Sequence, residues 1–215
     1  GIVDDPKEHK HLKVTHDRPV PRGGGLVIYS ALVITGAVFL PHDVKTLGIM
    51  AGATVLTWVG YLDDRYQETV SPYVRLVLNA VAALCVIGVG IGVTYVTNPL
   101  GGIIQLNWIF ADLFALVWLV ALQNVVGWSS GVEGQLSGFV VVAAIAMAIL
   151  GMRTLSQTPF VVLSAITAGA YVGFGVWNWY PQKIMPGYGG KSLAGFLLGV
   201  LAILATAKVG ALVMI

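Results

Sequence analysis

Charged side chains are scarce in this sequence. Only 10% of its 215 residues are Asp, Glu, Lys or Arg, whereas 57% are hydrophobic, and the mean hydropathy is +0.84. A water-soluble domain of this size does not need so apolar a composition, so the sequence indicates an integral membrane protein without a separate soluble domain. The formal net charge of +2 is too small to indicate a nucleic-acid-binding surface.

Cysteine is also nearly absent. The single Cys85 lies inside an apolar run. It excludes an intramolecular disulfide and any zinc site built from several cysteines.

Long apolar runs recur along the whole chain. A run of about 15 to 24 such residues is taken as a membrane-spanning helix, since backbone groups in hydrocarbon must be paired within the segment. The sequence predicts an all-α, polytopic bundle with seven complete spans: 26–40, 47–62, 76–96, 108–128, 139–152, 160–180 and 192–207. The fifth run is short for a bilayer and is expected to be tilted or shielded by neighbours.

The two ends of the chain suggest a fragment. The chain begins in a polar segment without an initiator Met and stops inside an apolar run, where an eighth helix is expected to begin near Lys208. We therefore predict one membrane domain over residues 1–215, truncated at both ends.

Loop charges predict the orientation. One set of loops is 1–25, 63–75, 129–138 and 181–191, and the other is 41–46, 97–107 and 153–159. The second set holds only Lys45 and Arg153 as basic residues, and the first holds nearly all the others. By the positive-inside rule the first set is cytoplasmic, in a cell membrane. Most acidic residues lie there too, although acids contribute little to orientation, so we expect a function on this face.

A transporter is disfavoured by what the apolar runs lack. Ionisable residues near mid-span, or broken helices in paired halves, are typical of transporters, and the sequence shows neither. The polar residues that intrude noticeably are Asn79, Asn124 and Asn178, all close to predicted cytoplasmic ends.

Two adjacent carboxylates, Asp63 and Asp64, follow the second run in the stretch GYLDDRYQ. If the helix continues, their side chains diverge by about 100° yet stay close enough to share one divalent cation such as Mg²⁺. The cation would relieve their repulsion at a low-dielectric boundary and leave coordination positions for phosphate oxygens. The alternative is a solvated helix end.

Two further loops of the same face carry groups that suit phosphates. The first, HKHLKVTHDRPVPRGGG, offers His16 and Arg22 beside flexible glycines, or is simply a basic membrane anchor. The third, QNVVGWSSGVEGQLSG, sets Asn124 inside a span and Glu133 between glycines near the next helix start, or is only an interhelical turn.

The fourth loop, YPQKIMPGYGGKSLAG, has the character of a phosphate cradle. Three glycines precede Lys191 and Ser192 at a helix start, although the spacing is not that of a Walker A motif and Ser192 alone would suit an N-cap. Each loop is ambiguous by itself. Their predicted position on one face favours a common site.

The order of these motifs resembles the polyprenyl-phosphate N-acetylhexosamine-1-phosphate transferase superfamily over essentially the whole chain. GIVDDP with THDRPVPRGGGL is similar to that family's first cytoplasmic loop, and VGYLDDR to its metal-associated Asp-Asp motif. QNVVGWSSGVEGQLSG is similar to NAxNxxDGxDGLAxG, and PQKIMPGYGGKSLAG to PAKxFxGDxGSLxLG.

The resemblance implies a Mg²⁺-dependent transferase that moves an N-acetylhexosamine 1-phosphate from a UDP-sugar to a polyprenyl phosphate. The products would be polyprenyl-diphosphate-sugar and UMP, for cell-envelope polysaccharide or glycan synthesis. Asp63 and Asp64 are the expected catalytic and metal-binding residues, and a homodimer is left open. Contacts to phosphate or nucleotide are expected from His16, Arg22, Asn124, Glu133 and Lys191.

Several residues depart from the family motifs and predict a divergent branch. Gly127 replaces the second Asn, Ser130 the first Asp and Glu133 the second Asp of the third-loop motif. Tyr188 stands where the family has the Asp of GDxGS, and Lys191 where it has Ser. Either the Asp-Asp pair holds the ion with phosphate and water, or Lys191 supplies positive charge to a phosphate instead. The rival prediction is a polyprenyl-phosphate-binding membrane protein of the same fold that has lost catalysis.

Overall fold

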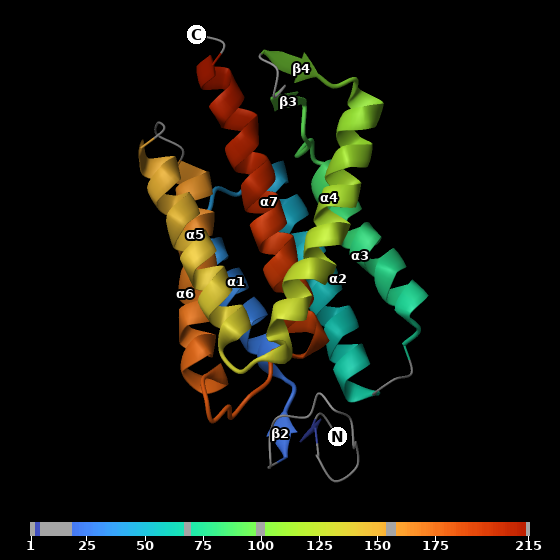
Figure 1. The fold of residues 1–215 in the computed structure, drawn as a ribbon, viewed down its shortest axis with the longest axis vertical. Coiled ribbons are helices and arrows are strands. Elements are labelled where there is room, and N and C mark those ends of the chain that lie inside the picture. Colours follow the sequence, from blue (N-terminus) through green and yellow to red (C-terminus); the bar gives the residue numbers. More distant parts are fainter. Residues whose placement is uncertain (1–2, 5–18, 67–69, 98–101, 154–157, 214–215) are drawn as a thin grey trace.

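The computed structural model describes residues 3–4, 19–66, 70–97, 102–153 and 158–213 (Figure 1). These residues form the helices α1 (Gly24–Phe39), α2 (Val44–Arg65), α3 (Pro72–Ile87), α4 (Trp108–Trp128), α5 (Gln135–Arg153), α6 (Thr158–Asn178) and α7 (Gly187–Val213). Two antiparallel pairs of short strands join β1 (Val3–Asp4) to β2 (Val20–Pro21) and β3 (Tyr95–Thr97) to β4 (Ile103–Gln105). Helices make up the architecture, so the predicted all-α class is confirmed.

The third predicted span ends earlier than expected. The helix α3 stops at Ile87, and the chain turns at Gly90, whose φ of +79° is a left-handed conformation that favours glycine. The chain then continues into β3, where its backbone groups pair with β4. The predicted helix to Val96 is therefore wrong, because the apolar run includes a turn and a strand.

The last helix is longer than predicted. It begins at Gly187 and continues through Lys208 to Val213, so the expectation of a separate eighth helix is wrong. The apolar run 192–207 continues at both ends into residues that keep the helical backbone. The fifth helix is not short either, since α5 has 19 residues.

Four helical segments of the described chain are long and apolar enough to cross a membrane: Trp108–Gly131, Gln135–Arg153, Pro159–Asn178 and Gly187–Ala205. The apolar helices α1 and α3 have 16 residues each. Such a helix is about 24 Å long, less than the hydrocarbon thickness of a typical bilayer. The structure thus has a multi-pass character with fewer full-length spans than the seven predicted.

Helix α7 is the centre of the bundle. It packs against α1, α2, α4 and α5, and Figure 1 shows it between the α5–α6 pair and α4. In its apolar window 78% of the residues are buried, against 28% in α4 and in α5. Its fully buried side chains include Leu193, Phe196, Leu197, Val200 and Leu201. The position of the α7 start is therefore determined by several helices at once.

The four motif-bearing segments meet at one end of this bundle. Figure 1 shows the start of α1, the end of α2, the α4–α5 turn and the α6–α7 connection together at the lower end. The β3–β4 pair and the C-terminus lie at the opposite end. The predicted common face of these loops is confirmed.

A glycine contact brings α2 against the first turn of α7. A Cβ at Gly60 would overlap the backbone of Gly189, so the two helix backbones touch directly. Small residues at helix interfaces permit such an approach. The last turn of α2 consequently lies beside the start of α7.

Gly60→Ala is expected to destabilise the protein by roughly 1–3 kcal/mol, because the new methyl group must displace backbone rather than a mobile side chain. The measurement is the thermal unfolding midpoint in detergent. The matched control is Gly173→Ala in α6, where nothing lies within 4 Å of an added Cβ, and its midpoint should stay equal or rise slightly. Equal midpoints for the two variants would contradict the described packing.

Candidate active site

Asp64 lies in the last turn of α2 and faces the first turn of α7. The backbone N–H of Tyr188 donates to its carboxylate, with N···O distances of 3.0 Å to Oδ1 and 3.1 Å to Oδ2. The first N–H groups of a helix lack partners within the helix and carry partial positive charge. Asp64 therefore caps α7 from a position 124 residues earlier in the chain.

Burial changes the acidity of Asp64, which lies beyond the apolar run 47–62. The residue is 7% exposed. This burial raises the pKa of Asp64 to about 6, although the Tyr188 N–H acts in the opposite direction. The Asp63 charge raises the pKa further, and the charges of Arg22 and Lys191 lower it. At neutral pH the site holds a buried negative charge that nearby cations relieve.

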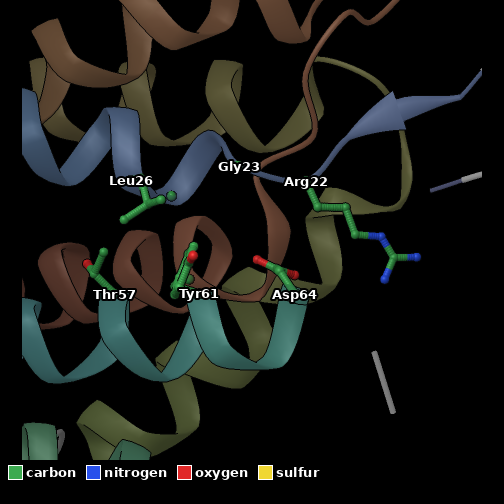
Figure 2. Close-up of a pocket in the computed structure, with 8 residues that line it drawn as sticks. Arg22, Gly23, Leu26, Thr57, Tyr61 and Asp64 are labelled. Carbon is green, nitrogen blue, oxygen red and sulfur yellow. The ribbon is translucent and has the colours of Figure 1, made fainter. Parts of the chain in front are cut away.

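A small pocket opens beside Asp64 (Figure 2). Its lining comes from the first loop and α1, from α2 and from α7: Arg22, Gly23, Gly25, Leu26, Thr57, Tyr61, Asp64 and Gly189. Figure 2 shows Thr57, Tyr61 and Asp64 projecting from α2 toward the start of α1. The first, second and fourth motif segments therefore share one pocket.

Backbone hydrogen bonds hold the first and fourth segments together at this pocket. Met185 N–H donates to Pro21 O at 2.8 Å, and Gly24 N–H donates to Met185 O at 3.0 Å. Gly187 follows with a φ of +64°, and a Cβ there would overlap both the Asp64 carboxylate and the Arg22 carbonyl. Only glycine fits this backbone at that place.

Asp63 has a different partner from Asp64. Its Oδ1 accepts hydrogen bonds from Arg75 at 2.9 Å to Nε and 2.7 Å to Nη2. The two carboxylates diverge because successive helix residues are rotated by about 100°. The neighbouring acids are therefore not equivalent, and their sharing of one cation stays a prediction.

Tyr188, which stands where the related motif has Asp, is 8% exposed. The Arg75 guanidinium lies 5.2 Å and the Lys191 ammonium 5.5 Å from the centroid of its ring, within cation–π distance. Its hydroxyl donates to Asn79 Oδ1 at 3.1 Å. One ring thus holds two cations beside the carboxylate pair.

The sequence prediction missed several members of this cluster. The sequence pattern does not single out Arg75, and it indicates Asn79 only as a polar residue that intrudes into a predicted span. Gln123 Nε2 donates to Asn79 O at 3.3 Å, and both residues are 1% exposed. Among the described atoms, Asn79 Nδ2 and Gln123 Oε1 are buried without a hydrogen-bond partner. The sequence signal that could have indicated this cluster is an amide side chain in each of two neighbouring apolar runs, Asn79 in the third and Gln123 in the fourth.

The other predicted substrate-binding residues are placed as follows. Arg22 lines the pocket with Asp64, and Lys191 lies against Tyr188. Asn124 Nδ2 donates to Val120 O of its own helix at 2.7 Å. Glu133 Oε2 accepts the Gln182 N–H at 3.0 Å and so links the α4–α5 turn to the α6–α7 connection. His16 lies outside the described residues. The binding roles of all five stay predictions.

The described side chains do not form a divalent-cation site of their own. No group of three or more His, Cys, Asp or Glu side chains gathers anywhere in the part of the chain that the structure covers. Asp63 already binds Arg75, and both oxygens of Asp64 accept the Tyr188 N–H. Octahedral Mg²⁺ needs oxygen ligands directed at one point. Binding of Mg²⁺ therefore stays a prediction from the resemblance.

The fold and the site define a multi-pass helical membrane protein whose charged residues gather at one end of the bundle. The family model described as Glycosyl transferase family 4 matches residues 46–206, so the chain belongs to this family.

Curated relatives agree with this assignment. A probable undecaprenyl-phosphate N-acetylglucosaminyl 1-phosphate transferase of Bacillus subtilis is 26% identical over 97% of this chain and 56% of its own length. A decaprenyl-phosphate N-acetylglucosaminephosphotransferase of Mycobacterium leprae is 29% identical over 85% of this chain and 50% of its own. A phospho-N-acetylmuramoyl-pentapeptide-transferase of Streptococcus thermophilus is 28% identical over 85% and 58%. The chain thus spans about half the length of the curated relatives it matches.

The raised pKa of Asp64 predicts a pH-dependent effect of Asp64→Asn. Because the folded-state pKa of about 6 exceeds the ordinary 3.8, the wild type loses stability as pH rises from about 4 to about 6. The asparagine variant lacks this loss. Its unfolding free energy relative to wild type should rise by on the order of 2–3 kcal/mol between pH 4 and pH 7, measured in detergent with EDTA.

Asp43→Asn at the opposite end of the bundle is the matched control. The Thr46 N–H lowers the pKa of Asp43, so this carboxylate stabilises the fold above its ordinary pKa. The stability of Asp43→Asn relative to wild type should therefore fall, not rise, as pH increases. A pH-independent difference for Asp64→Asn would show that Asp64 titrates normally.

Proposed function

We propose that this protein transfers an N-acetylhexosamine 1-phosphate from a UDP-sugar to a polyprenyl phosphate, giving polyprenyl-diphosphate-sugar and UMP. Family membership supports the reaction class, and the names of the relatives support a polyprenyl phosphate acceptor. The observation that carries the proposal is the junction of Asp64, the pocket lined by Arg22 and the start of α7 at one end of an apolar bundle. An anionic lipid head and an anionic nucleotide would meet at such a place.

The motif-bearing end would lie in the cytoplasm of a cell-membrane protein. Its loops hold most of the basic residues, and short loops with many Lys and Arg stay on that side. Residues 1–215 would form part of one membrane domain. UDP-sugars are soluble, so this orientation gives the site access to its donor substrate.

The proposed reaction would require little covalent catalysis by the protein. An oxygen of the lipid phosphate would attack the sugar-bearing phosphorus, and the bond from that phosphorus to the bridging oxygen would break. Its electron pair would leave with UMP. Positioning and neutralisation of charge supply most of the rate enhancement in phosphoryl transfer. Arg22 and Lys191 would neutralise the diphosphate, while Asp64 would hold the first turn of α7 in place.

UDP-N-acetylglucosamine is the first donor to test, because the names of two of the three relatives contain N-acetylglucosamine. UDP-N-acetylmuramoyl-pentapeptide is the second, after the third relative. The glycan that receives the product would belong to the cell envelope, in keeping with the resemblance.

Wild-type protein in membranes should convert labelled UDP-N-acetylglucosamine and polyprenyl phosphate into labelled lipid. Asp64→Asn should lower the rate by on the order of 100-fold, because the capped start of α7 and its neighbouring cations lose their anionic partner. Asp43→Asn is the matched control and should stay near the wild-type rate, since Asp43 caps α2 at its other end. Rates are compared at equal amounts of monodisperse protein.

Absence of labelled lipid with either donor, from folded full-length protein, would contradict the transferase. Retained binding of polyprenyl phosphate would then favour the non-catalytic lipid-binding protein.

A further inference from the structure

We propose that Lys191, positioned by the Tyr188 ring and lying beside Gly127, is a built-in cation that lets this protein bind a nucleoside diphosphate without a divalent metal ion. The proposal rests on the proposed function for the identity of the ligand, the UDP part of the donor. Lys191 is the group that would contact phosphate, and Tyr188 is a positioning residue.

Tyr188 couples the lysine to the carboxylate through two different groups. Its backbone N–H holds Asp64, and its ring holds the Lys191 ammonium. Residues three apart lie on the same face of a helix, so Lys191 returns over the ring one turn later. The ring is buried and its hydroxyl is anchored on Asn79, which prevents it from rotating away.

The backbone of Gly127 in α4 lies close to the lysine stem. A Cβ at this position would lie 3.5 Å from Lys191 Cγ and 3.7 Å from both Cβ and Cδ, which is ordinary van der Waals contact. The stem of Lys191 is therefore held beside α4 as well as beside the Tyr188 ring.

Beside the two carboxylates, α7 presents a neutral aromatic ring and an ammonium group. No third acidic side chain joins Asp63 and Asp64 in the part of the chain that the structure describes. This composition favours an anion over a divalent cation.

The Arg75–Asp63 ion pair leaves Lys191 for this role. Asp63 is bound by Arg75 through two nitrogens, so its charge is matched without Lys191. Asp64 accepts the Tyr188 N–H, and its charge interacts with both Arg22 and Lys191, so these two cations already lie where a diphosphate would need them. A diphosphate entering beside the start of α7 would receive the ammonium group as a charge-assisted donor.

The test measures binding of UDP to full-length protein in nanodiscs by calorimetry, once in EDTA and once in Mg²⁺. Wild type should bind with dissociation constants that agree within about threefold in the two conditions. Lys191→Met should weaken binding in EDTA by at least about tenfold. Lys183→Met is the matched control at the same end of the bundle, since Lys183 lies 5.2 Å from the Trp177 ring, and it should stay within about threefold of wild type.

Variants of Tyr188 separate positioning from general structure. Tyr188→Phe keeps the ring and loses only the hydroxyl contact to Asn79, so it should weaken UDP binding in EDTA less than Tyr188→Leu does, which should bind about three- to tenfold more weakly than wild type. Tyr188→Asp should make UDP binding depend on Mg²⁺ and should strengthen binding of Mn²⁺, followed by electron paramagnetic resonance. If the Leu variant does not fold, Lys191→Met and Tyr188→Asp still decide the question.

The outcomes distinguish this inference from the transferase itself. UDP binding by wild type that disappears in EDTA would overturn the inference even where labelled lipid forms in Mg²⁺. Unchanged binding by Lys191→Met would overturn it as well. If UDP binding in EDTA depends on Lys191 but no sugar phosphate is transferred, the result would support this inference and contradict the proposed transferase reaction.

Discussion

The close contact between α2 and the first turn of α7 is the constraint on which the site depends. Gly60 and Gly189 allow the backbones to touch, and Asp64 then reaches the Tyr188 N–H. A buried carboxylate needs donors and a helix start needs acceptors, so each satisfies the other. The same contact places Arg22 at the pocket and Lys191 beside the ring of Tyr188. The close packing of α2 against α7 at these two glycines therefore determines where the charged side chains of the site lie.

A charged side chain at the end of an apolar bundle is costly in free energy unless a group that stabilises the charge lies beside it. In this site the charged side chains have different partners. Asp63 is bound by Arg75, Asp64 lies at a helix start, and the Tyr188 ring carries two cations. The adjacent acids Asp63 and Asp64 therefore bind different partners and have different structural roles. An anionic substrate would enter an environment that already contains ordered cations, which lowers the reorganisation required of the protein.

Sequence patterns predicted the helices well where an apolar run and a helix coincide. The run 108–128 has the bounds of α4, and its ends are marked by Trp108 and Trp128. The prediction failed where an apolar composition hides a turn, as at Gly90, and where polar residues belong to a helix, as at Gly187 to Lys191. In both cases hydrophobicity reports burial, while backbone conformation is set by glycine torsions and by neighbouring elements.

The sequence by itself determined the membrane character, the helical class and the set of loops that carry the polar motifs, because these depend on local composition and run length. It also indicated Asp64, Arg22 and Lys191 as members of one face. Only the tertiary structure decided that Asp63 binds Arg75, that Asp64 caps α7 and that Gly127, Tyr188 and Lys191 belong together. Asp63 and Arg75 are 12 residues apart, and Asp64 and Tyr188 are 124 residues apart, so no local pattern contains these pairs.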